Sequence, residues 1–165
     1  MVGQSHLLGE AGTIQQLLKL HPLPSLILWG PPGVGKTTLA RLIAKTAKMA
    51  PDNIAVPPRE FIQLLAVIAG VADLRKAFEQ AQTVGGIILL IDEIHRFNKS
   101  QQDALLGPVE SGLVILIGAT TENPSFSLNS ALLSRARVIS LNRLTETDLE
   151  NLLEKAAAYL GRRLP

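Results

Sequence analysis

One short segment has the residue types and spacing of a loop that binds the phosphates of a nucleotide. The sequence there fits the pattern G-x-x-x-x-G-K-[ST] without a mismatch, and its residues are Gly30, Pro31, Pro32, Gly33, Val34, Gly35, Lys36 and Thr37. Thr38, directly after the pattern, is a further candidate for binding the nucleotide. Glycines let consecutive backbone N–H groups point at an anion, and the start of a following helix adds partial positive charge. We expect Lys36 to reach the β- and γ-phosphates and the Thr37 hydroxyl to ligate Mg²⁺. The alternative is a glycine-rich turn that binds nothing.

Two adjacent acids, Asp92 and Glu93, follow the apolar run 87–91. Ligands of open α/β sheets lie at the carboxyl ends of the strands, so both acids are expected to face the phosphate loop. We assign Asp92 to Mg²⁺ and Glu93 to orienting and deprotonating an attacking water. The alternative is a pair of solvated acids. His95 has no second ligand candidate at helical spacing, so we expect it to pack or to hydrogen-bond rather than to bind a metal.

Further polar candidates follow two other segments. Thr120 and Thr121 come after the apolar run 113–117, and either hydroxyl could bond to a γ-phosphate or to the water. Ordinary turn chemistry explains them equally well. Arg135 and Arg137 follow a short predicted helix, and neither must reach the nucleotide of its own subunit. They are candidates for an arginine supplied to a neighbouring subunit, with a surface salt bridge as the alternative.

Strands that alternate with helices must position these residues. The apolar runs that we interpret as strands are 26–29, 61–68, 87–91, 113–117 and 138–141. The predicted helices are 36–48, 71–82, one that opens with a capping box at Ser100, and 130–136. The segment 49–59 holds three prolines and is expected to be a loop. The run 87–91 is apolar on both faces, as a central parallel strand must be. The order predicts an α/β domain with a mostly parallel sheet flanked by helices.

The last part of the chain has a different character. Residues 145–148 have capping-box form, and the apolar residues after them lie on one helical face: Leu149, Leu152, Leu153, Ala156 and Leu160. Such a face needs a partner that the finished sheet does not offer. We therefore divide the chain into an α/β core, residues 1–143, and the start of a helical lid, residues 144–165.

Composition limits the class of protein without indicating its chemistry. Of 165 residues, 47% are apolar, so a core can form, and the absence of cysteine excludes disulfides and thiolate zinc sites. No apolar run approaches the ~18 residues of a membrane span, and the first residues do not resemble a signal peptide. We expect no membrane partner and a cytoplasmic location, in the bacterial cytosol or nucleoid. The net charge of +2 is too small to indicate nucleic-acid binding by itself. Arg41, Lys45 and Lys48 share helical spacing, yet a solvated face explains them equally well.

Several longer strings resemble the AAA+ ATPases, which have a P-loop NTPase core. The closest resemblance is to the replication-associated recombination protein A family, which is similar to clamp-loader subunits. The strings that carry it are residues 3–9, 28–33, 92–103, 117–126 and 129–137.

The resemblance implies hydrolysis of ATP with Mg²⁺, stimulated by forked or single-stranded DNA, at stalled replication forks or in recombination repair. It also implies a homo-oligomer, with single-strand-binding protein and replisome components as further partners. By motif position Thr121 would sense the γ-phosphate and Arg135 would be the arginine finger that acts on a neighbour. Residues 2–8 would lie against the adenine, with Gln4, Leu7 and Leu8 as contacts.

Three departures from the family pattern bear on function. Leu65 stands where relatives usually place a polar residue that can restrain the catalytic glutamate, so we expect no such switch here. Residues 106–110 differ from the usual string, which affects the expected local geometry. We also expect the remaining lid, with its sensor arginine, and the oligomerisation domain to lie outside the chain. The alternatives are a clamp-loader subunit, a branch-migration motor, or a nucleotide-dependent assembly switch that does not hydrolyse ATP.

Overall fold

The computed structural model describes residues 3–8, 12–20, 22–48, 58–159 and 161. Five strands form its sheet: β1 (Ser25–Trp29), β2 (Glu60–Leu65), β3 (Ile87–Asp92), β4 (Val114–Thr120) and β5 (Ala136–Ser140). The helices are α1 (Ser5–Leu8), α2 (Thr13–Leu18), α3 (Lys36–Lys48), α4 (Val71–Val84), η1 (Ile94–Arg96), α5 (Lys99–Glu110), α6 (Pro124–Ser127), α7 (Ser130–Leu133) and α8 (Glu146–Tyr159).

The sheet has the strand order β2-β3-β4-β1-β5, and every neighbouring pair is parallel. Strands β3 and β4 lie inside it and are buried along their whole length. This confirms the expected parallel sheet. Because all strands point the same way, the residues that follow them meet at one edge.

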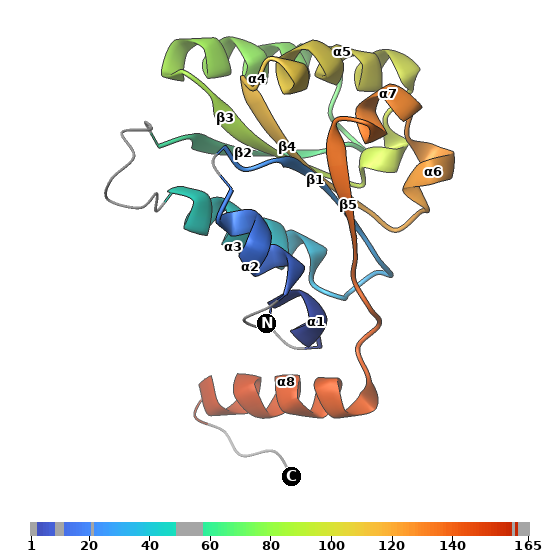
Figure 1. Ribbon diagram of the computed structural model, residues 1–165. Coiled ribbons are helices and arrows are strands. Elements are labelled where there is room, and N and C mark those ends of the chain that lie inside the picture. The colour runs from blue at the N-terminus through green and yellow to red at the C-terminus, as the bar shows by residue number, and fades with distance from the viewer. Residues whose placement is uncertain (1–2, 9–11, 21, 49–57, 160, 162–165) are drawn as a thin grey trace.

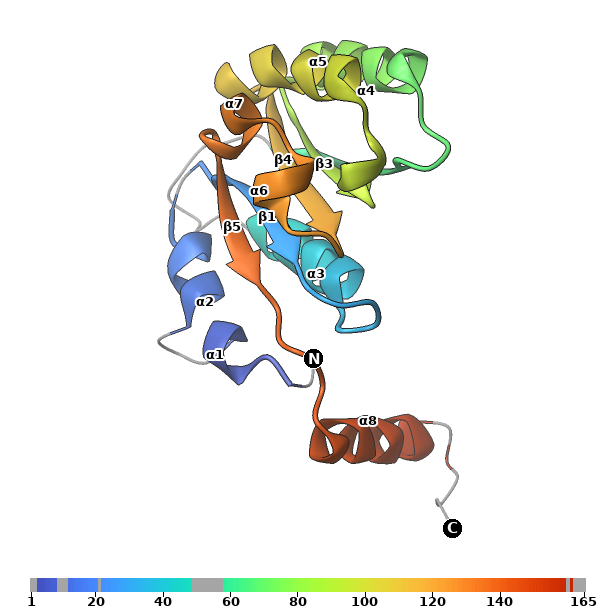
Figure 2. The same cartoon turned by 90° about the vertical axis from the view of Figure 1, so that its right-hand side faces the viewer.

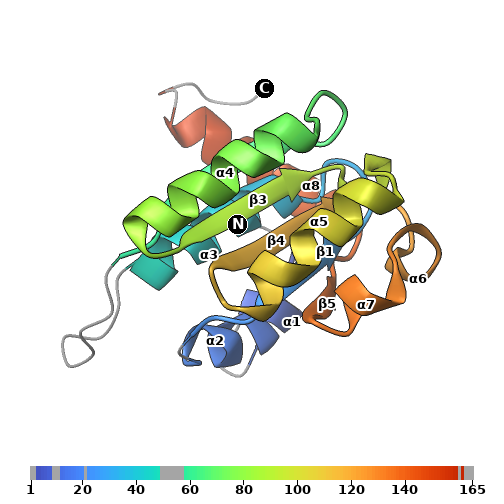
Figure 3. The same ribbon diagram turned by 90° about the horizontal axis from the view of Figure 1, so that it is seen from above.

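Helices cover both faces of the sheet, as Figures 1 and 3 show. Leu26 and Leu28 of β1 pack in one apolar cluster with residues of α1, α2 and α3. Ile27, between them, belongs to the other cluster, with residues of α4, α5 and α7. Side chains of a strand alternate between its faces, so one apolar run supplies both cores.

Helix α8 lies apart from the sheet and its covering helices (Figures 1 and 2). Its predicted capping box is present: Thr145 N donates to Asp148 Oδ2 at 2.8 Å, and Asp148 N donates to Thr145 Oγ1 at 3.2 Å. Leu149, Leu152 and Leu153 are each about half exposed, as the predicted unpartnered face requires. The division into core and lid stays a prediction.

Several boundaries differ from those predicted. Strand β4 continues to Thr120 rather than ending at Ile117, because ladder pairing with β1 extends to Trp29. Strand β2 ends at Leu65 rather than at residue 68. Helix α7, predicted over residues 130–136, ends at Leu133, because β5 already begins at Ala136. Most of the predicted loop, residues 49–57, lies outside the described part.

The predicted capping box at Ser100 was also wrong. Asn98 is the N-cap of α5: its side chain accepts from Gln101 N, and Gln101 Oε1 accepts from Asn98 N, both at 2.9 Å. Asn98 and Gln101 have the required three-residue spacing, so the helix begins at Lys99. It then continues through Gly107 and Pro108 to Glu110, which settles the geometry of the unusual string. No helix of the described residues is long and apolar enough to cross a membrane.

Candidate nucleotide-binding site

The predicted phosphate loop joins the end of β1 to the start of α3. Gly33 and Gly35 have φ angles of 78° and 96°, a left-handed conformation that glycine adopts without strain. The Lys36 ammonium is folded back on this loop and donates to the carbonyls of Gly30 at 2.8 Å and Pro31 at 2.7 Å. A phosphate would compete for these protons. Thr38 is exposed in the first turn of α3.

Lys36 is buried, and this changes its acid–base behaviour. Burial lowers the pKa of the Lys36 ammonium, and the negative charges of Glu93 and then Asp92 oppose that effect. Asp92 lies beside the loop, because its carboxylate accepts from the Thr37 hydroxyl at 2.8 Å. Both acids act on the Lys36 ammonium, and Glu93 acts more strongly than Asp92 does.

Asp92 is held by neighbours on two elements. Thr37 Oγ1 donates to Asp92 Oδ1 at 2.8 Å, and Gln63 Nε2 donates to Asp92 Oδ2 at 2.7 Å. The hydroxyl and the carboxylate thus converge as oxygen ligands of the kind that Mg²⁺ takes. Among the described residues no group of three or more His, Cys, Asp or Glu could hold a metal. A cation at Asp92 would therefore complete its shell with phosphate and water oxygens, as Mg²⁺ commonly does.

Gln63 is a site residue that sequence reasoning missed. Its Oε1 also accepts from Arg41 Nη2 at 2.8 Å, so a chain of bonds runs from α3 through β2 to Asp92. The available signal was a polar side chain inside an otherwise apolar run, which reads Phe61-Ile62-Gln63-Leu64-Leu65. Arg41 was one of the basic residues considered as a contact to DNA, and its guanidinium here donates a hydrogen bond to Gln63.

Glu93 has φ 56°, and among the described residues it is the only non-glycine with a positive φ. Its Oε2 lies 3.1 Å from His95 Nε2, and His95 Nδ1 lies 2.9 Å from Thr120 Oγ1. This confirms the expectation that His95 forms hydrogen bonds. Leu65, which pairs in register with Asp92, is 48% exposed and has no polar group to restrain Glu93.

The two threonines after β4 have different surroundings. The Thr120 side chain is buried, bonds to His95 and accepts from Glu122 N at 3.1 Å. Thr121 lines a pocket of about 390 Å³ beside the phosphate loop, with Trp29, Gly30, Pro31, Pro32, Ser140, Leu141 and Arg143. The geometry therefore gives Thr121, rather than Thr120, access to a ligand in this pocket.

A second pocket, of about 310 Å³, adjoins the same loop. It is lined by Pro31, Pro32, Gly33, Val34, Arg143, Leu144 and Leu149. Arg143 borders both pockets, and sequence reasoning missed it. The available signal was a basic residue shortly after the last strand, β5 (Ala136–Ser140). Because Leu149 belongs to α8, the beginning of that helix forms one wall of the site.

The segment predicted to contact adenine lies against the linker after β5. Gln4 Nε2 donates to the Asn142 carbonyl at 2.9 Å, and Asn142 N donates to Gln4 Oε1 at 3.1 Å. Leu7 is buried in the core, and Leu8 packs against it. Val2 is outside the described residues. Contact of Gln4, Leu7 and Leu8 with adenine stays a prediction.

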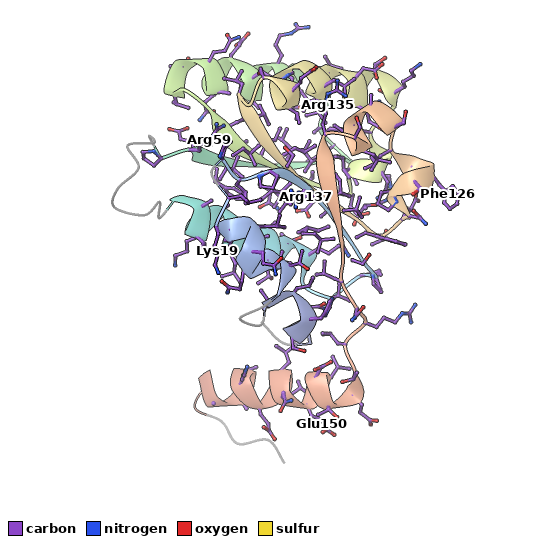
Figure 4. The ribbon with its side chains drawn as sticks, in the orientation of Figure 1. Lys19, Arg59, Phe126, Arg135, Arg137 and Glu150 are labelled. Atoms are coloured by element: carbon purple, nitrogen blue, oxygen red, sulfur yellow. The ribbon has the colours of Figure 1, made fainter. Side chains whose placement is uncertain are left out.

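Arg135 and Arg137 lie at the other end of the sheet from the phosphate loop. Ser25, at the start of β1, pairs with Ala136, whereas the loop follows the end of β1. Figure 4 shows Arg135 beside α7, far from α8 and its Glu150. Arg135 donates to the Ala131 carbonyl at 2.8 Å and pairs with Glu110 at 3.2 Å. The side chain of the exposed Arg137 makes no hydrogen bond or ion pair within the described residues.

Comparison with known proteins agrees with this geometry. The family model "ATPase family associated with various cellular activities (AAA)" matches residues 26–144. The solved structure of the Thermotoga maritima RuvB Holliday junction branch migration motor superposes with a TM-score of 0.77 at 26% identity. The match covers 97% of this chain and 52% of that one.

Curated relatives are more similar in sequence. Replication-associated recombination protein A of Coxiella burnetii is 53% identical over 99% of this chain and 35% of its own length. That of Escherichia coli K12 is 48% identical over 94% of this chain and 33% of its own length. ATPase WRNIP1 of Dictyostelium discoideum is 46% identical over 93% of this chain and 17% of its own length. The chain thus spans about a third or less of these relatives. With its phosphate loop, acidic strand end and parallel sheet, the chain belongs to the AAA ATPase family, as a nucleotide-binding module homologous to that of replication-associated recombination protein A.

Proposed function

We propose that this chain is the ATP-hydrolysing module of a protein of DNA replication and recombination repair. The observation that carries the proposal is the 2.8 Å bond from the Thr37 hydroxyl to Asp92. It joins the phosphate loop to the strand end that also bears Glu93, so the groups for binding and for hydrolysis share one edge.

Each residue has a separate task. Lys36 gives up its loop carbonyls for the β- and γ-phosphates, where its charge is weakly screened. Thr37 and Asp92 hold Mg²⁺, which neutralises charge on the phosphates when it is bound. Glu93 orients the attacking water and accepts its proton. Thr121 hydrogen-bonds the γ-phosphate or the water from its place in the pocket wall.

An arginine from a second copy of the chain would complete this site. Arg135 is too far along the sheet to serve its own phosphate loop, since it precedes β5 while the loop follows β1. Its ion pair with Glu110 is exposed, so little free energy would oppose its release toward a neighbour. A homo-oligomer with active sites between subunits is therefore part of the proposal.

The names of the relatives support the cellular role. Two of these relatives are named replication-associated recombination protein A. An ATPase that acts at stalled replication forks and is stimulated by forked or single-stranded DNA is consistent with these names. Single-strand-binding protein and replisome components would then be partners, in the bacterial cytosol or nucleoid. The likeness to a branch migration motor at 26% identity favours a motor on branched DNA as the second candidate.

The test is the steady-state ATPase rate over a range of protein concentrations, with and without forked or single-stranded DNA. A specific rate that rises with both supports interfacial, DNA-stimulated hydrolysis. Glu93→Gln should bind a fluorescent ATP analogue normally and lose turnover by at least ~10²-fold. Lys36→Ala should lose binding itself. Unchanged turnover in Glu93→Gln would refute the assignment of Glu93 as the base. ATP binding without turnover in the wild type would instead favour the alternative function, a nucleotide-dependent assembly switch that does not hydrolyse ATP.

A further inference from the structure

A line of three side chains connects Glu93 to the end of β4. Glu93 Oε2 lies 3.1 Å from His95 Nε2, and His95 Nδ1 lies 2.9 Å from Thr120 Oγ1. Glu93 directly follows β3, His95 lies in the short helix η1, and Thr120 is the last residue of β4. Both ring nitrogens of His95 are therefore used, one on each side.

The surroundings of this line make it rigid. The His95 side chain is 5% exposed, whereas that of Glu93 is 40% exposed. Thr120 is buried, accepts from Glu122 N at 3.1 Å, and belongs to a strand that is buried throughout. Glu122 Oε1 is also 3.9 Å from His95 Nε2, beyond hydrogen-bonding distance. A fixed imidazole thus contacts a carboxylate that would otherwise move in solvent.

The proton positions follow from these contacts. When Glu93 is ionised its carboxylate only accepts, so His95 Nε2–H must donate to it. In the neutral ring Nδ1 is then an acceptor for the one proton of the Thr120 hydroxyl. The Glu122 carbonyl is a second acceptor for that proton at 3.3 Å, and the shorter 2.9 Å contact favours His95 Nδ1. This arrangement, in which a base is oriented by a second group that a third group holds, is common among catalytic sites.

The backbone of Glu93 limits where its carboxylate can point. Its left-handed φ of 56° is rare for a non-glycine residue and is found preferentially at functional sites. The negative charge of Glu93 opposes the lowering of the Lys36 pKa by burial, so the carboxylate that contacts His95 also acts on the ammonium of the phosphate loop. Because β1, β4 and β3 are parallel, His95 holds Glu93 at the same edge of the sheet as that loop.

We propose that His95 is a positioning residue for Glu93, held in turn by Thr120, so that the base is oriented from η1 and β4 rather than from β2. In this chain β2 ends in Leu65, which has no polar group for the task. The proposal rests on the proposed role of Glu93 as the base. It also links the base directly to the strand end that carries Thr121, because Thr120 and Thr121 are adjacent.

Two substitutions separate the two contacts of the ring. The amide of glutamine reaches about as far as Nε2 of histidine, and the amide of asparagine about as far as Nδ1. His95→Gln therefore keeps a donor for Glu93 and loses the contact with Thr120, whereas His95→Asn does the reverse. We expect His95→Asn and His95→Ala to lower kcat at least ~10-fold at unchanged affinity for ATP, and His95→Gln to stay within ~3-fold of the wild type.

Thr120 offers a second pair of variants. Thr120→Val has a similar shape but no hydroxyl, whereas Thr120→Ser retains it. We expect Thr120→Val to lower kcat about 3- to 10-fold and Thr120→Ser to leave it near that of the wild type. Combining His95→Ala with Glu93→Gln should cause no loss beyond that of Glu93→Gln, because His95 acts through Glu93.

These measurements, made with thermal unfolding and binding of a fluorescent ATP analogue, decide the matter. Equal kcat values for His95→Asn and His95→Gln, or an additive loss in the double variant, would overturn the proposal. So would a parallel fall in unfolding temperature and ATP binding in all His95 variants, which is the signature of a merely structural histidine. Full turnover in Glu93→Gln would instead refute the proposed base, whatever the His95 variants do.

Discussion

The side-chain amide of Gln63 donates to Asp92 Oδ2 across 2.7 Å, which joins the middle of β2 to the end of β3. The amide cannot rotate freely, because its oxygen accepts from Arg41 Nη2 at 2.8 Å. One carboxylate oxygen of Asp92 is thereby fixed by β2 and the other by Thr37. The orientation of the proposed cation ligand thus depends on two elements besides its own strand.

Gln63→Leu should weaken the use of Mg²⁺ without unfolding the protein. Loss of the amide frees one oxygen of Asp92, and removing a partner of a ligating carboxylate commonly costs about 10-fold in metal affinity or more. Titrating ATP turnover with Mg²⁺ measures the shift in the midpoint. Arg41→Ala, one bond further out, should give a smaller shift, and the exposed Lys45→Ala on the same helix serves as a control. Equal midpoints in Gln63→Leu and Lys45→Ala would contradict the role of Gln63.

Thr37→Val should lose Mg²⁺-dependent nucleotide affinity. The hydroxyl that contacts Asp92 is removed while the branched shape is kept. We expect the dissociation constant of ATP to rise about 10-fold or more with Mg²⁺ present and to change little in EDTA. Thr46→Val, which changes the same residue type further along α3, is the matched control. An equal rise with and without Mg²⁺ would mean that Thr37 does not act through the cation.

Lys36 should make stability depend on pH in the alkaline range. Burial depresses the pKa of Lys36 in the folded state, so the folded protein releases this proton before the unfolded chain does. At a pH between the folded-state pKa and the ordinary value of 10.5, the unfolded chain binds more protons at Lys36 than the folded protein does. The free energy of unfolding therefore increases as the pH rises through this range. Urea unfolding of the wild type and of Lys36→Met should therefore show the wild type improving relative to the variant as pH rises toward 10.5. A constant difference would argue against a depressed pKa.

Arg135 and Arg137 form a matched pair for testing a trans-acting arginine. Arg135→Ala should lower kcat about 10³-fold while each subunit still binds ATP, since an arginine finger is worth roughly that factor. Arg137→Ala should leave turnover nearly unchanged. Mixing Arg135→Ala with Glu93→Gln should restore part of the activity, because some interfaces then join an intact base to an intact arginine. If mixing restores nothing although the proteins co-assemble, the arginine does not act between subunits.

Arg143→Ala should weaken nucleotide binding, because Arg143 borders both pockets beside the phosphate loop. We expect the dissociation constant of ATP to rise about 5-fold, equivalent to roughly 1 kcal/mol. Fluorescence titration with an ATP analogue measures the change. The exposed Arg75→Ala on α4 alters the net charge equally and controls for long-range electrostatics. The same affinity in both variants would place Arg143 outside the binding site.

The sequence by itself determined the parts of this protein that depend on local pattern. The spacing of Gly30, Gly33 and Gly35 before Lys36 predicts the phosphate loop, and apolar runs bounded by turns predict the parallel strands. Parallel strands place their ends at one edge, so the approach of Asp92 to Thr37 also followed from the pattern. The capping box at Thr145 was readable because its partners are three residues apart.

Only the tertiary structure decided which side chains meet across long separations in the chain. Gln63 reaches Asp92, and Gln4 reaches Asn142, through the packing of elements far apart in sequence. Thr120 and Thr121 looked equivalent, yet the extra length of β4 turns one toward His95 and leaves the other in the pocket wall. Such contacts depend on strand register and on the path of η1. Neither feature produces a periodic pattern in the sequence, because the fold, and not the spacing of residues along the chain, determines which side chains come into contact.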